Sequence, residues 1–346
     1  MNYVIDGLFL TQNITGIQRY AYEICKELDK FIRKDEIEIL VPADTECIPE
    51  YENLKIIKYG NHHGRAWEQF DLCRYLMKNK KQGIFLMNEI SLMYPRGIAC
   101  IHDISYKVNP GFFNIGEKRV SALWHRLNYS SIIRNCQKIV TVSEFSKEEI
   151  IREYHIDGNR LTVAYNSWQH ISDIRETENI FEKYSFLKEN EYYFSMATLA
   201  PNKNFRWILS AAKENPQSEF AIAGGGKLKD IANNLGYADL SNVHFLGYVS
   251  DEDAKALMRY CRAFLFPTLY EGFGIPPLEA VASGCRELIV SDIRCMHEIY
   301  GDYAYYIDPE DYSDIYLDDF TSKEDITGLL GRYSWKRSAQ KIYNLL

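Results

Sequence analysis

Short apolar runs alternate with longer amphipathic stretches along most of the chain. The runs are rich in β-branched and aromatic side chains, as in Lys138–Val142 and Tyr192–Met196, a composition typical of buried strands. Between the runs, apolar residues recur with helical periodicity, as in Gly16–Phe31. An alternation of strands and helices predicts parallel α/β units.

The strand pattern occurs in two series. The expected strands are Tyr3–Ile5, Ile37–Val41, Leu54–Ile57, Ile84–Met87, Ile98–Ile101, Lys138–Val142 and Leu161–Val163, and then Tyr192–Met196, Glu219–Ala223, Val243–Leu246, Ala263–Phe266 and Glu287–Val290. The expected helices of the first half are Gly16–Phe31, Trp67–Lys78, Glu117–Asn135 and Lys147–Tyr154. We therefore expect two doubly wound sheets.

A polar stretch between the two series predicts the domain boundary. Ser167–Asn190 is rich in Asp, Glu and Ser, as linkers often are. We expect a first Rossmann-like domain over residues 1–170, a linker over 171–190 and a second Rossmann-like domain over 191–325. The tail, residues 326–346, contains an amphipathic helix from Ser334 that needs a surface to pack on, and we expect it to cross back to the first domain.

Length and composition agree with two soluble domains. At 346 residues with 46% apolar content, the chain is about twice a typical domain length. The apolar runs are far shorter than the roughly 20 residues that span a bilayer, and the N-terminus does not resemble a secretory signal. Eight cysteines without C-x-x-C spacing argue against a zinc site or a disulfide framework. We expect a cytoplasmic protein with mostly buried thiols.

The formal charge of −8 is unevenly distributed. Residues 1–170 hold 22 Lys and Arg against 21 Asp and Glu, and the remainder holds 18 against 27. Nucleic-acid binding normally depends on concentrated Lys and Arg at the phosphates. The acidic balance therefore excludes nucleic acid as an expected partner.

One segment combines a glycine-rich turn with two carboxylates. It runs Tyr270-Glu271-Gly272-Phe273-Gly274-Ile275-Pro276-Pro277-Leu278-Glu279-Ala280, between an apolar strand and a helical stretch. Glycines let the backbone approach a diphosphate, and N–H groups at a helix start stabilise its charge. Glu271 and Glu279 can accept hydrogen bonds from hydroxyls at opposite ends of one ligand. The same pattern also fits an ordinary turn followed by a surface helix.

The segment Glu271–Glu279 resembles the Glu-x7-Glu signature of retaining glycosyltransferases of family 4, which share the GT-B fold. Other segments resemble motifs of that family in the same order. They are Thr15–Tyr20 for the first glycine-rich loop, Ile101–Asp103 for the His-Asp strand end, Val142–Lys147 for the last turn of the first domain, Ala200–Asn204 for the Pro-x-Lys-Asn loop, Phe245–Ser250 for the segment around the nucleotide base, and Ser334-Trp335 for the start of the closing helix. The resemblance covers nearly the whole chain and implies an α/β GT-B protein: two Rossmann-like domains facing a central cleft, with the C-terminal helix packed on the first.

The resemblance also implies roles for single residues. The catalytic candidates are His102 beside the sugar, Lys203 at the departing phosphate, and Glu271 at the transferred sugar. The donor-binding candidates are Gly16, Lys203, Val249, Phe273, Gly274, Ile275 and Glu279, with Glu279 accepting hydrogen bonds from the ribose. Considered without the family, Lys203 can also be a solvated loop lysine, Gly16 a helix-capping glycine and His102 a structural histidine.

Some positions depart from this pattern or imitate another one. Thr198 stands where many relatives carry an arginine, and Arg19 is another source of positive charge. Asp251-Glu252-Asp253 fits the D-x-D pattern of metal-dependent transferases, but it follows Ser250 and therefore predicts a capped helix start. Gly224–Lys227 lacks the Walker spacing and predicts a turn at a strand end. We expect no metal and no other cofactor.

Together these features predict a hexosyltransferase that moves a sugar from a nucleotide-sugar donor to a glycan or a polyprenyl-diphosphate-linked acceptor, in polysaccharide, O-antigen or capsule synthesis. Relatives of the surface-polysaccharide type use GDP-mannose, a UDP-hexose or dTDP-rhamnose, and GDP-mannose is the preferred interpretation. The alternative is a non-catalytic sugar-nucleotide-binding subunit of a polysaccharide assembly complex. An NAD-linked oxidoreductase is disfavoured because residues 6–16 lack G-x-G-x-x-G.

A surface helix is predicted within Glu117–Lys138. Its basic and aromatic residues are Lys118, Arg119, Trp124, His125, Arg126, Tyr129, Arg134 and Lys138, and its apolar residues are Val120, Leu123, Leu127, Ile132 and Ile133. Such a helix can lie on an anionic lipid surface, although stripes of this kind usually pack on their own sheet. If the helix lies on lipid, we expect peripheral contact of the protein with the inner face of the plasma membrane.

Overall fold

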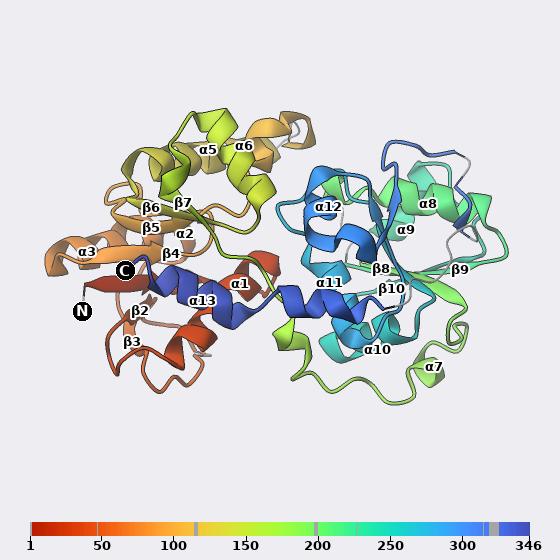
Figure 1. Cartoon of the computed structure of the whole chain (residues 1–346), viewed down its shortest axis with the longest axis horizontal. Helices are drawn as coiled ribbons and strands as arrows, with labels where there is room; N and C mark the ends of the chain where they lie inside the picture. Colours follow the sequence, from red (N-terminus) through yellow and green to blue (C-terminus); the bar gives the residue numbers. More distant parts are fainter. Residues whose placement is uncertain are drawn as a thin grey trace. The chain divides into compact units, whose positions relative to one another are not determined.

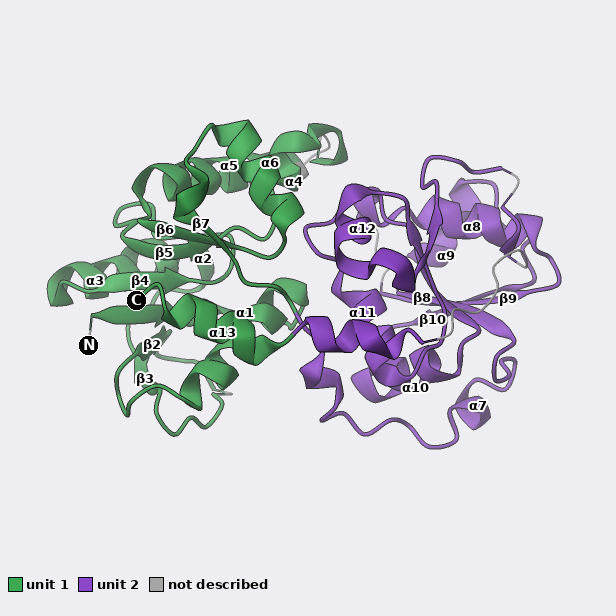
Figure 2. Cartoon of the chain, viewed as in Figure 1, with its two compact units in different colours: residues 1–166, 334–346 green, residues 167–333 purple. Residues whose placement is uncertain are grey.

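The chain forms two compact units. The computed structural model describes residues 2–46, 48–113, 117–196, 200–225, 227–313, 315–317 and 325–346, without the side chains of 117 and 118. Unit 1 consists of residues 1–166 and 334–346, and unit 2 of residues 167–333 (Figures 1 and 2). The segment 171–190, predicted as a linker, is therefore part of unit 2. The tail predicted over 326–346 is divided between the two units at Ser334.

Unit 1 is built on a seven-stranded parallel sheet in the order β3-β2-β1-β4-β5-β6-β7. Its strands are β1 (Tyr3–Asp6), β2 (Glu38–Val41), β3 (Lys55–Lys58), β4 (Gln82–Phe85), β5 (Gly97–Cys100), β6 (Lys138–Thr141) and β7 (Leu161–Val163). In β1, Ile5 aligns with Ile39 on one side and with Ile84 on the other. The strand order reverses between β1 and β4, and ligands of open α/β sheets bind at such a point, beyond the carboxyl ends of the strands.

Helices cover this sheet, and two of them begin at recognisable N-caps. They are α1 (Gly16–Asp29), α2 (Gly64–Ala66), the π-helical turn η2 (Trp67–Leu72), α3 (Cys73–Asn79), α4 (Ser105–Val108), α5 (Glu117–Asn135), α6 (Glu144–Tyr154) and α13 (Trp335–Tyr343), with 3-10 turns η1 (Leu8–Thr11), η3 (Pro110–Phe113) and η4 (Gly158–Arg160). Helix α1 begins in a capping box of Thr15 and Gln18. Helix α6 begins three residues before the predicted start because the Ser143 hydroxyl accepts the Ser146 N–H at 3.0 Å.

The C-terminal helix α13 packs on unit 1, as its amphipathic pattern requires. Trp335 is buried and meets the Tyr20 ring of α1 at a centroid distance of 5.8 Å. The Ser338 hydroxyl donates to the Tyr165 carbonyl at 2.6 Å, and Lys341 Nζ donates to the Val163 carbonyl at 2.7 Å. The apolar side of the helix thus covers α1, while its polar groups bind the end of β7.

Unit 2 repeats the architecture with a six-stranded parallel sheet in the order β10-β9-β8-β11-β12-β13. Its strands are β8 (Tyr192–Met196), β9 (Glu219–Ala223), β10 (Val243–Gly247), β11 (Ala263–Phe266), β12 (Leu288–Ser291) and β13 (Tyr305–Ile307). Its helices are α7 (Ile180–Lys183), α8 (Phe205–Glu214), α9 (Leu228–Asn234), α10 (Asp251–Tyr260), α11 (Ile275–Ser283) and α12 (Arg294–Tyr300), with 3-10 turns η5 (Gln169–Ile171), η6 (Pro201–Lys203), η7 (Gly301–Tyr303) and η9 (Thr327–Arg332).

The predicted fold class is confirmed. All twelve predicted strands are present, with bounds that differ by a few residues, and both sheets are parallel. Strand β13 is not among the predicted strands; its three residues include two half-buried tyrosines. It is nevertheless bonded to β12, with Tyr306 opposite Val290.

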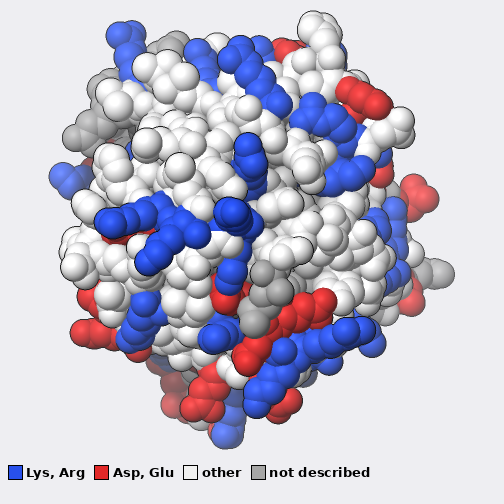
Figure 3. Space-filling view, turned by 90° about the vertical axis from the view of Figure 1, so that its left-hand side faces the viewer, with Lys and Arg blue, Asp and Glu red and all other residues white. Residues whose placement is uncertain are grey.

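The cysteines are buried as expected in the described part of the chain. Seven cysteines are buried free thiols, whereas Cys47 lies outside the described residues. Lys and Arg side chains gather in several groups on the face seen in Figure 3, with acidic side chains mainly toward its lower edge. No helix among the described residues has the length and apolar character required to span a membrane.

Candidate functional site

The glycine-rich turn of unit 2 connects β11 to α11. Gly274 stands immediately before the helix with a φ of 79°, a left-handed conformation that favours glycine. A Cβ at this position would lie 2.8 Å from Met296 Cε, so a larger residue would have to displace the end of that side chain in addition to adopting the left-handed backbone. The Tyr300 hydroxyl donates a hydrogen bond to the Gly274 carbonyl, which helps to fix the turn.

The start of α11 offers few backbone donors, and they are grouped. Pro276 and Pro277 carry no N–H, so the first turn of the helix presents the N–H of Ile275 without competition from its two successors. Phe273 and Ile275 are both buried, and Phe273 packs edge-to-face on Tyr333 at 5.4 Å. The amides of residues 273–275 are therefore held in one fixed turn at the positive end of a helix dipole.

Lys203 and Glu271 are brought together beside this turn. Lys203 Nζ lies 2.6 Å from Glu271 Oε1 and 5.1 Å from the centroid of the Phe266 ring. Thr268 Oγ1 lies 3.0 Å from the same Glu271 oxygen. The side chains of Lys203 and Glu271 are 24% and 14% exposed, so each remains accessible to a ligand. An ammonium group beside a glycine-rich turn can stabilise an anionic phosphate.

Three hydrogen bonds of Asn202 fix the loop that carries Lys203. The Asn202 carbonyl accepts the Leu269 N–H at 2.7 Å and the Thr268 hydroxyl at 2.7 Å. Asn202 Nδ2 donates to the Tyr270 carbonyl at 3.3 Å. The loop after β8 and the loop after β11 therefore form one bonded unit, although they are far apart in the sequence.

Glu279 has a partner that the sequence analysis missed. Its Oε1 lies 2.8 Å from Nε2 of His170, which comes from η5. The His170 side chain is 3% exposed and that of Glu279 is 19% exposed. The imidazole thus holds the carboxylate from the buried side and leaves the other side open. The two residues are 109 positions apart, and a lone histidine in a polar stretch gave no signal of this contact.

The remaining motifs of unit 2 occupy defined places. Val249 is buried beyond the end of β10. Asp253 accepts hydrogen bonds from Thr177 and Lys183, and its N–H donates to the Ser250 hydroxyl at 3.2 Å. The predicted capped helix start at α10 is thereby confirmed. Gly224 follows β9 and its N–H bonds to the Gly247 carbonyl at 2.8 Å. Thr198 and Gly226, both named by the sequence analysis, lie outside the described residues.

Gly16 and His102 belong to unit 1. Thr15 is the cap of α1, and Gly16 is the first helical residue, so the interpretation of Gly16 as the capping residue is wrong. His102 follows β5 and is 6% exposed. Its Nε2 lies 2.9 Å from the Leu86 carbonyl, which can only accept, so the proton of the neutral ring is on Nε2. Burial lowers the pKa of His102, which favours that neutral form.

A pair of buried carboxyl groups occupies the point of unit 1 where the strand order reverses. Asp6 ends β1, Glu68 lies in η2, and their side chains are hydrogen-bonded to each other. Burial raises the pKa of Asp6 to about 6 and the pKa of Glu68 well above its ordinary value. Asp6 also accepts the Leu8 N–H at 3.0 Å. A proton shared between two buried carboxyl groups in contact avoids the repulsion between two negative charges.

Helix α5 presents an apolar stripe to solvent. Val120, Leu123 and Leu127 are 72%, 60% and 51% exposed, and their spacing places them on one side of the helix. The prediction that Ile132 and Ile133 join this stripe is wrong, because both pack into the core of unit 1. The side chain of Lys118 lies outside the described residues.

Two protein families match the chain, one in each unit. Residues 14–167 match the family described as Glycosyltransferase Family 4, and residues 176–317 match the family described as Glycosyl transferases group 1. The chain is a family 4 glycosyltransferase. The predicted family and the predicted enzyme class are thus confirmed.

Two named relatives align with a large part of this glycosyltransferase. It is 27% identical over 332 residues to "O-antigen chain mannosyltransferase B" of Escherichia coli, covering 86% of this chain and 84% of the relative. It is 30% identical over 246 residues to "O-antigen chain mannosyltransferase RfbU" of Salmonella typhimurium, covering 69% of this chain and 64% of the relative.

Solved structures share the fold of the glycosyltransferase. The structure of Anabaena HepE in complex with UDP-glucose has a TM-score of 0.70 at 14% identity and covers 99% of each chain. Sucrose-phosphate synthase of Thermosynechococcus elongatus has a TM-score of 0.68 at 13% identity, covering 99% of this chain and 94% of the other. Both sheets of this chain therefore belong to the GT-B fold.

Proposed function

We propose that this glycosyltransferase transfers a hexose with retention of configuration from a nucleotide diphosphate sugar to a glycan during surface-polysaccharide synthesis, and that the donor is GDP-mannose. The observation that carries the proposal is the arrangement of Lys203 and Glu271 beside the Gly274 turn at the start of α11. That arrangement suits a sugar diphosphate, because a cation and grouped amides lie next to a carboxylate that accepts hydrogen bonds from hydroxyls.

The donor would bind to unit 2 along α11. Its diphosphate would take the place of Glu271 as the partner of Lys203 and would meet the amides of residues 273–275. Glu279, held by His170 at 2.8 Å, would accept hydrogen bonds from the ribose hydroxyls. Glu271, released from Lys203, would accept from the hydroxyls of the transferred sugar.

The reaction would proceed without a protein nucleophile. The bond from the anomeric carbon to the phosphate oxygen breaks, the acceptor oxygen bonds to the same face of the sugar, and its proton passes to the leaving phosphate. The chain supplies positioning and stabilises the charge of the leaving group. One well-aimed donor such as Lys203 contributes roughly 2.7–4 kcal/mol to such a transition state. We propose that no metal is needed.

The names of the relatives support the choice of sugar and pathway. Two of them are described as O-antigen chain mannosyltransferases. Mannose would also be the sugar that this chain transfers if the contacts to its hydroxyls are shared with those relatives. The glycan acceptor, whether free or linked to a polyprenyl diphosphate, is part of the same proposal.

Contact with an anionic membrane surface through α5 completes the proposal. The exposed stripe of Val120, Leu123 and Leu127 can enter the apolar boundary of the bilayer. Arg119 and Arg126 are seven residues apart and exposed, so they lie on one flank of the stripe. Each contributes about 1 kcal/mol near anionic headgroups. Peripheral binding would bring the enzyme to a lipid-linked acceptor.

A donor-hydrolysis screen tests the proposed function. In the absence of acceptor, water replaces the attacking hydroxyl, and release of the nucleoside diphosphate is measured with GDP-mannose, UDP-glucose, UDP-galactose and dTDP-rhamnose. We expect GDP release from GDP-mannose to be the fastest. If GDP binds but no nucleotide sugar is hydrolysed, the proposal is wrong and a binding subunit is the better description. If a different nucleotide sugar is preferred, the donor assignment is wrong.

A further inference from the structure

Two cysteines of unit 2 meet at the ends of neighbouring helices. Cys261 is the C-cap of α10, and Cys285 follows Gly284, the C-cap of α11. The two residues are 24 positions apart in the chain, yet their Sγ atoms lie 3.7 Å apart. Because a disulfide bond is about 2.05 Å long, an approach of less than about 2 Å joins the two sulfurs.

Main-chain groups hold both thiols in this position. Cys261 Sγ lies 3.1 Å from the Met258 carbonyl oxygen, and Cys285 Sγ lies 3.2 Å from the Glu287 carbonyl oxygen. The Cys285 N–H donates to the Ala280 carbonyl at 2.9 Å. The two cysteines are only 1% and 3% exposed. Their sulfurs therefore face each other within the packed ends of two helices.

The two thiols differ in acidity. The hydrogen bond with the Cys261 thiol lowers the pKa of Cys285, because it stabilises the thiolate. Burial raises the pKa of Cys261. The thiolate is the nucleophilic form of a cysteine, and a second thiol nearby can resolve the product of its oxidation. Cys285 is thus suited to attack an oxidant, and Cys261 is suited to complete a disulfide.

The surface beside Gly284 offers a route to Cys285. The two residues that flank Cys285, Gly284 and Arg286, are exposed. A Cβ at Gly284 would lie 3.4 Å from Arg259 Cγ, so the Arg259 side chain passes over the glycine. That side chain is 49% exposed, with its Nη1 2.7 Å from Glu176 Oε1. Exposed side chains change rotamer within nanoseconds, and such a movement uncovers the glycine for a molecule as small as hydrogen peroxide.

The segment between the two cysteines contains the predicted donor motif. It starts before β11, includes Thr268, Glu271 and the turn at Gly274, and ends after α11. A disulfide that closes a loop restricts the unfolded chain and thereby favours the folded state. A bond between Cys261 and Cys285 would therefore stabilise the whole motif against unfolding.

We infer that hydrogen peroxide converts Cys261 and Cys285 to a reversible disulfide, and that this bond stabilises the segment between them in its folded form. The Cys285 thiolate attacks one peroxide oxygen, the O–O bond breaks, and the released hydroxide takes up the proton that the Cys285 thiol had lost. The Cys261 sulfur then attacks the sulfur of the Cys285 sulfenic acid. The S–S bond forms, the S–O bond breaks, and hydroxide leaves with the Cys261 proton as a second water.

The electrons of this reaction balance. The two thiols together lose two electrons, and one hydrogen peroxide is reduced to two waters. A dithiol reductant reverses the step by thiol–disulfide exchange. The chemistry is separate from sugar transfer, so the inference does not rest on the proposed function.

Mass spectrometry of the full chain before and after treatment with hydrogen peroxide tests the cross-link. We expect the intact mass to fall by that of two hydrogen atoms, a peptide pair that joins Cys261 to Cys285, and return of the original mass after dithiothreitol. Absence of that peptide pair would overturn the inference. Accumulation of sulfinic acid at Cys285 in its place would do the same, because it would show that Cys261 does not reach the oxidised sulfur.

Urea denaturation with pulse proteolysis tests the stabilisation. Peptides of unit 2 give its midpoint, which should rise by roughly 1 M urea when the wild-type chain is oxidised. In Cys261→Ala and in Cys285→Ala, the oxidised and reduced forms should have the same midpoint. Each variant is compared with its own reduced form, so a loss of stability from the substitution itself does not affect the result. A wild-type midpoint that stays constant or falls on oxidation would overturn the inference.

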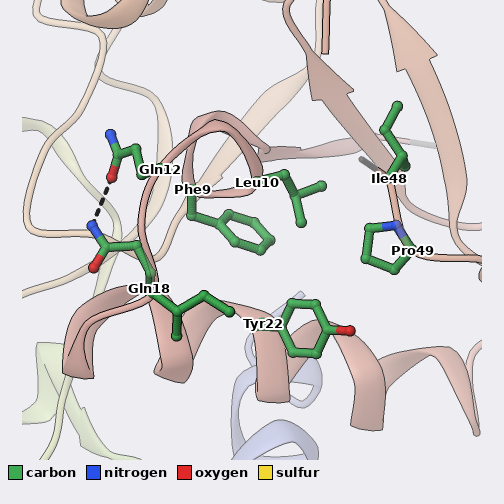
Figure 4. Close-up of a pocket in the computed structure, with 8 residues that line it drawn as sticks. Phe9, Leu10, Gln12, Gln18, Tyr22, Ile48 and Pro49 are labelled. Atoms are coloured by element: carbon green, nitrogen blue, oxygen red, sulfur yellow. Dashed lines mark hydrogen bonds between the residues drawn. The ribbon is translucent and has the colours of Figure 1, made fainter. Parts of the chain in front are cut away.

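Cys25→Ala is the matched control from unit 1. Cys25 is a buried thiol of α1, three residues after Tyr22, which lines a cavity of about 430 Å³ (Figure 4). A small oxidant can come close to this helix as well, but burial raises the pKa of Cys25 and keeps it protonated. Cys25→Ala should therefore keep the wild-type cross-link and the wild-type shift in midpoint. Loss of both in this variant would assign the oxidation to a different thiol and contradict the inference.

Discussion

Replacement of Asp6 by Asn tests whether the buried carboxyl pair of unit 1 costs stability at neutral pH. Asp6 is fully enclosed, accepts the Leu8 N–H at 3.0 Å and is hydrogen-bonded to Glu68. In Asp6→Asn, the amide oxygen can still accept from Leu8, and the amide nitrogen can donate to Glu68. The substitution thus preserves the local bonds and removes one buried ionisable group.

The magnitude follows from the pKa of Asp6, which burial raises from 3.8 to about 6 in the folded protein. Because the folded state holds the proton more tightly than the unfolded state, the stabilisation is complete below about pH 4 and is lost as the pH rises through about 6. Between pH 5 and pH 7, the wild-type protein should lose about 1.3 kcal/mol through this group. The variant should not, so its stability relative to wild type should rise by at least that amount.

Urea denaturation at closely spaced pH values measures this difference. The two units can unfold separately, so pulse proteolysis with mass spectrometric counting of unit 1 peptides gives the midpoint for unit 1 alone. The exposed Glu52→Gln is the matched control, for which we expect a change below about 0.5 kcal/mol. The reasoning would be refuted if the stability of Asp6→Asn minus that of the wild type stays constant or falls between pH 5 and pH 7.

Four further predictions concern the donor site and α5. Lys203→Ala and Glu279→Ala should each lower turnover at least tenfold, because a charge-assisted contact to the donor is worth roughly 1.5–3 kcal/mol. His170→Phe should raise the KM for the donor more than it lowers kcat, since His170 positions Glu279 and would not touch the reacting atoms. Transfer should survive excess EDTA, because we propose no metal. Leu123→Ser with Leu127→Ser should weaken co-sedimentation with anionic vesicles at low salt.

Each of these predictions has a control and a contrary result. Lys229→Ala, an exposed lysine of unit 2, should keep full turnover, and wild-type turnover in Lys203→Ala would contradict the site assignment. Equal losses in kcat and kcat/KM with no change in KM for His170→Phe would assign it a different role. Activity that EDTA abolishes and Mg²⁺ or Mn²⁺ restores would show a metal requirement. Leu235→Ser is the control for α5, and absence of wild-type vesicle binding would retire the membrane contact.

Local patterns determined most of the secondary structure of this protein. Twelve of the strands and the long helix α5 follow from periodicity that is visible within a few residues. Caps such as Ser143 and Ser250 are equally local, because the hydroxyl and the N–H that it accepts are three residues apart. The motif from Glu271 to Glu279 was also visible in the sequence, since its glycines and carboxylates lie in one continuous segment.

Candidate residues could be named from the sequence, but their partners could not. Lys203 and Glu271 were both candidates, and only the pairing of the two loops through Asn202 placed them 2.6 Å apart. The exposed side of α5 was ambiguous for the same reason, since burial of Ile132 depends on what the helix packs against.

The tertiary structure alone decided the contacts that join distant segments. His170 meets Glu279 across 109 residues, and Asp6 meets Glu68 because the strand order reverses at β1. Neither pair has a signal in the sequence, because a lone histidine or a lone buried glutamate carries no information about its partner. The physical reason is that periodicity records which side of an element faces the core, whereas the identity of the neighbour is fixed only when the sheets assemble.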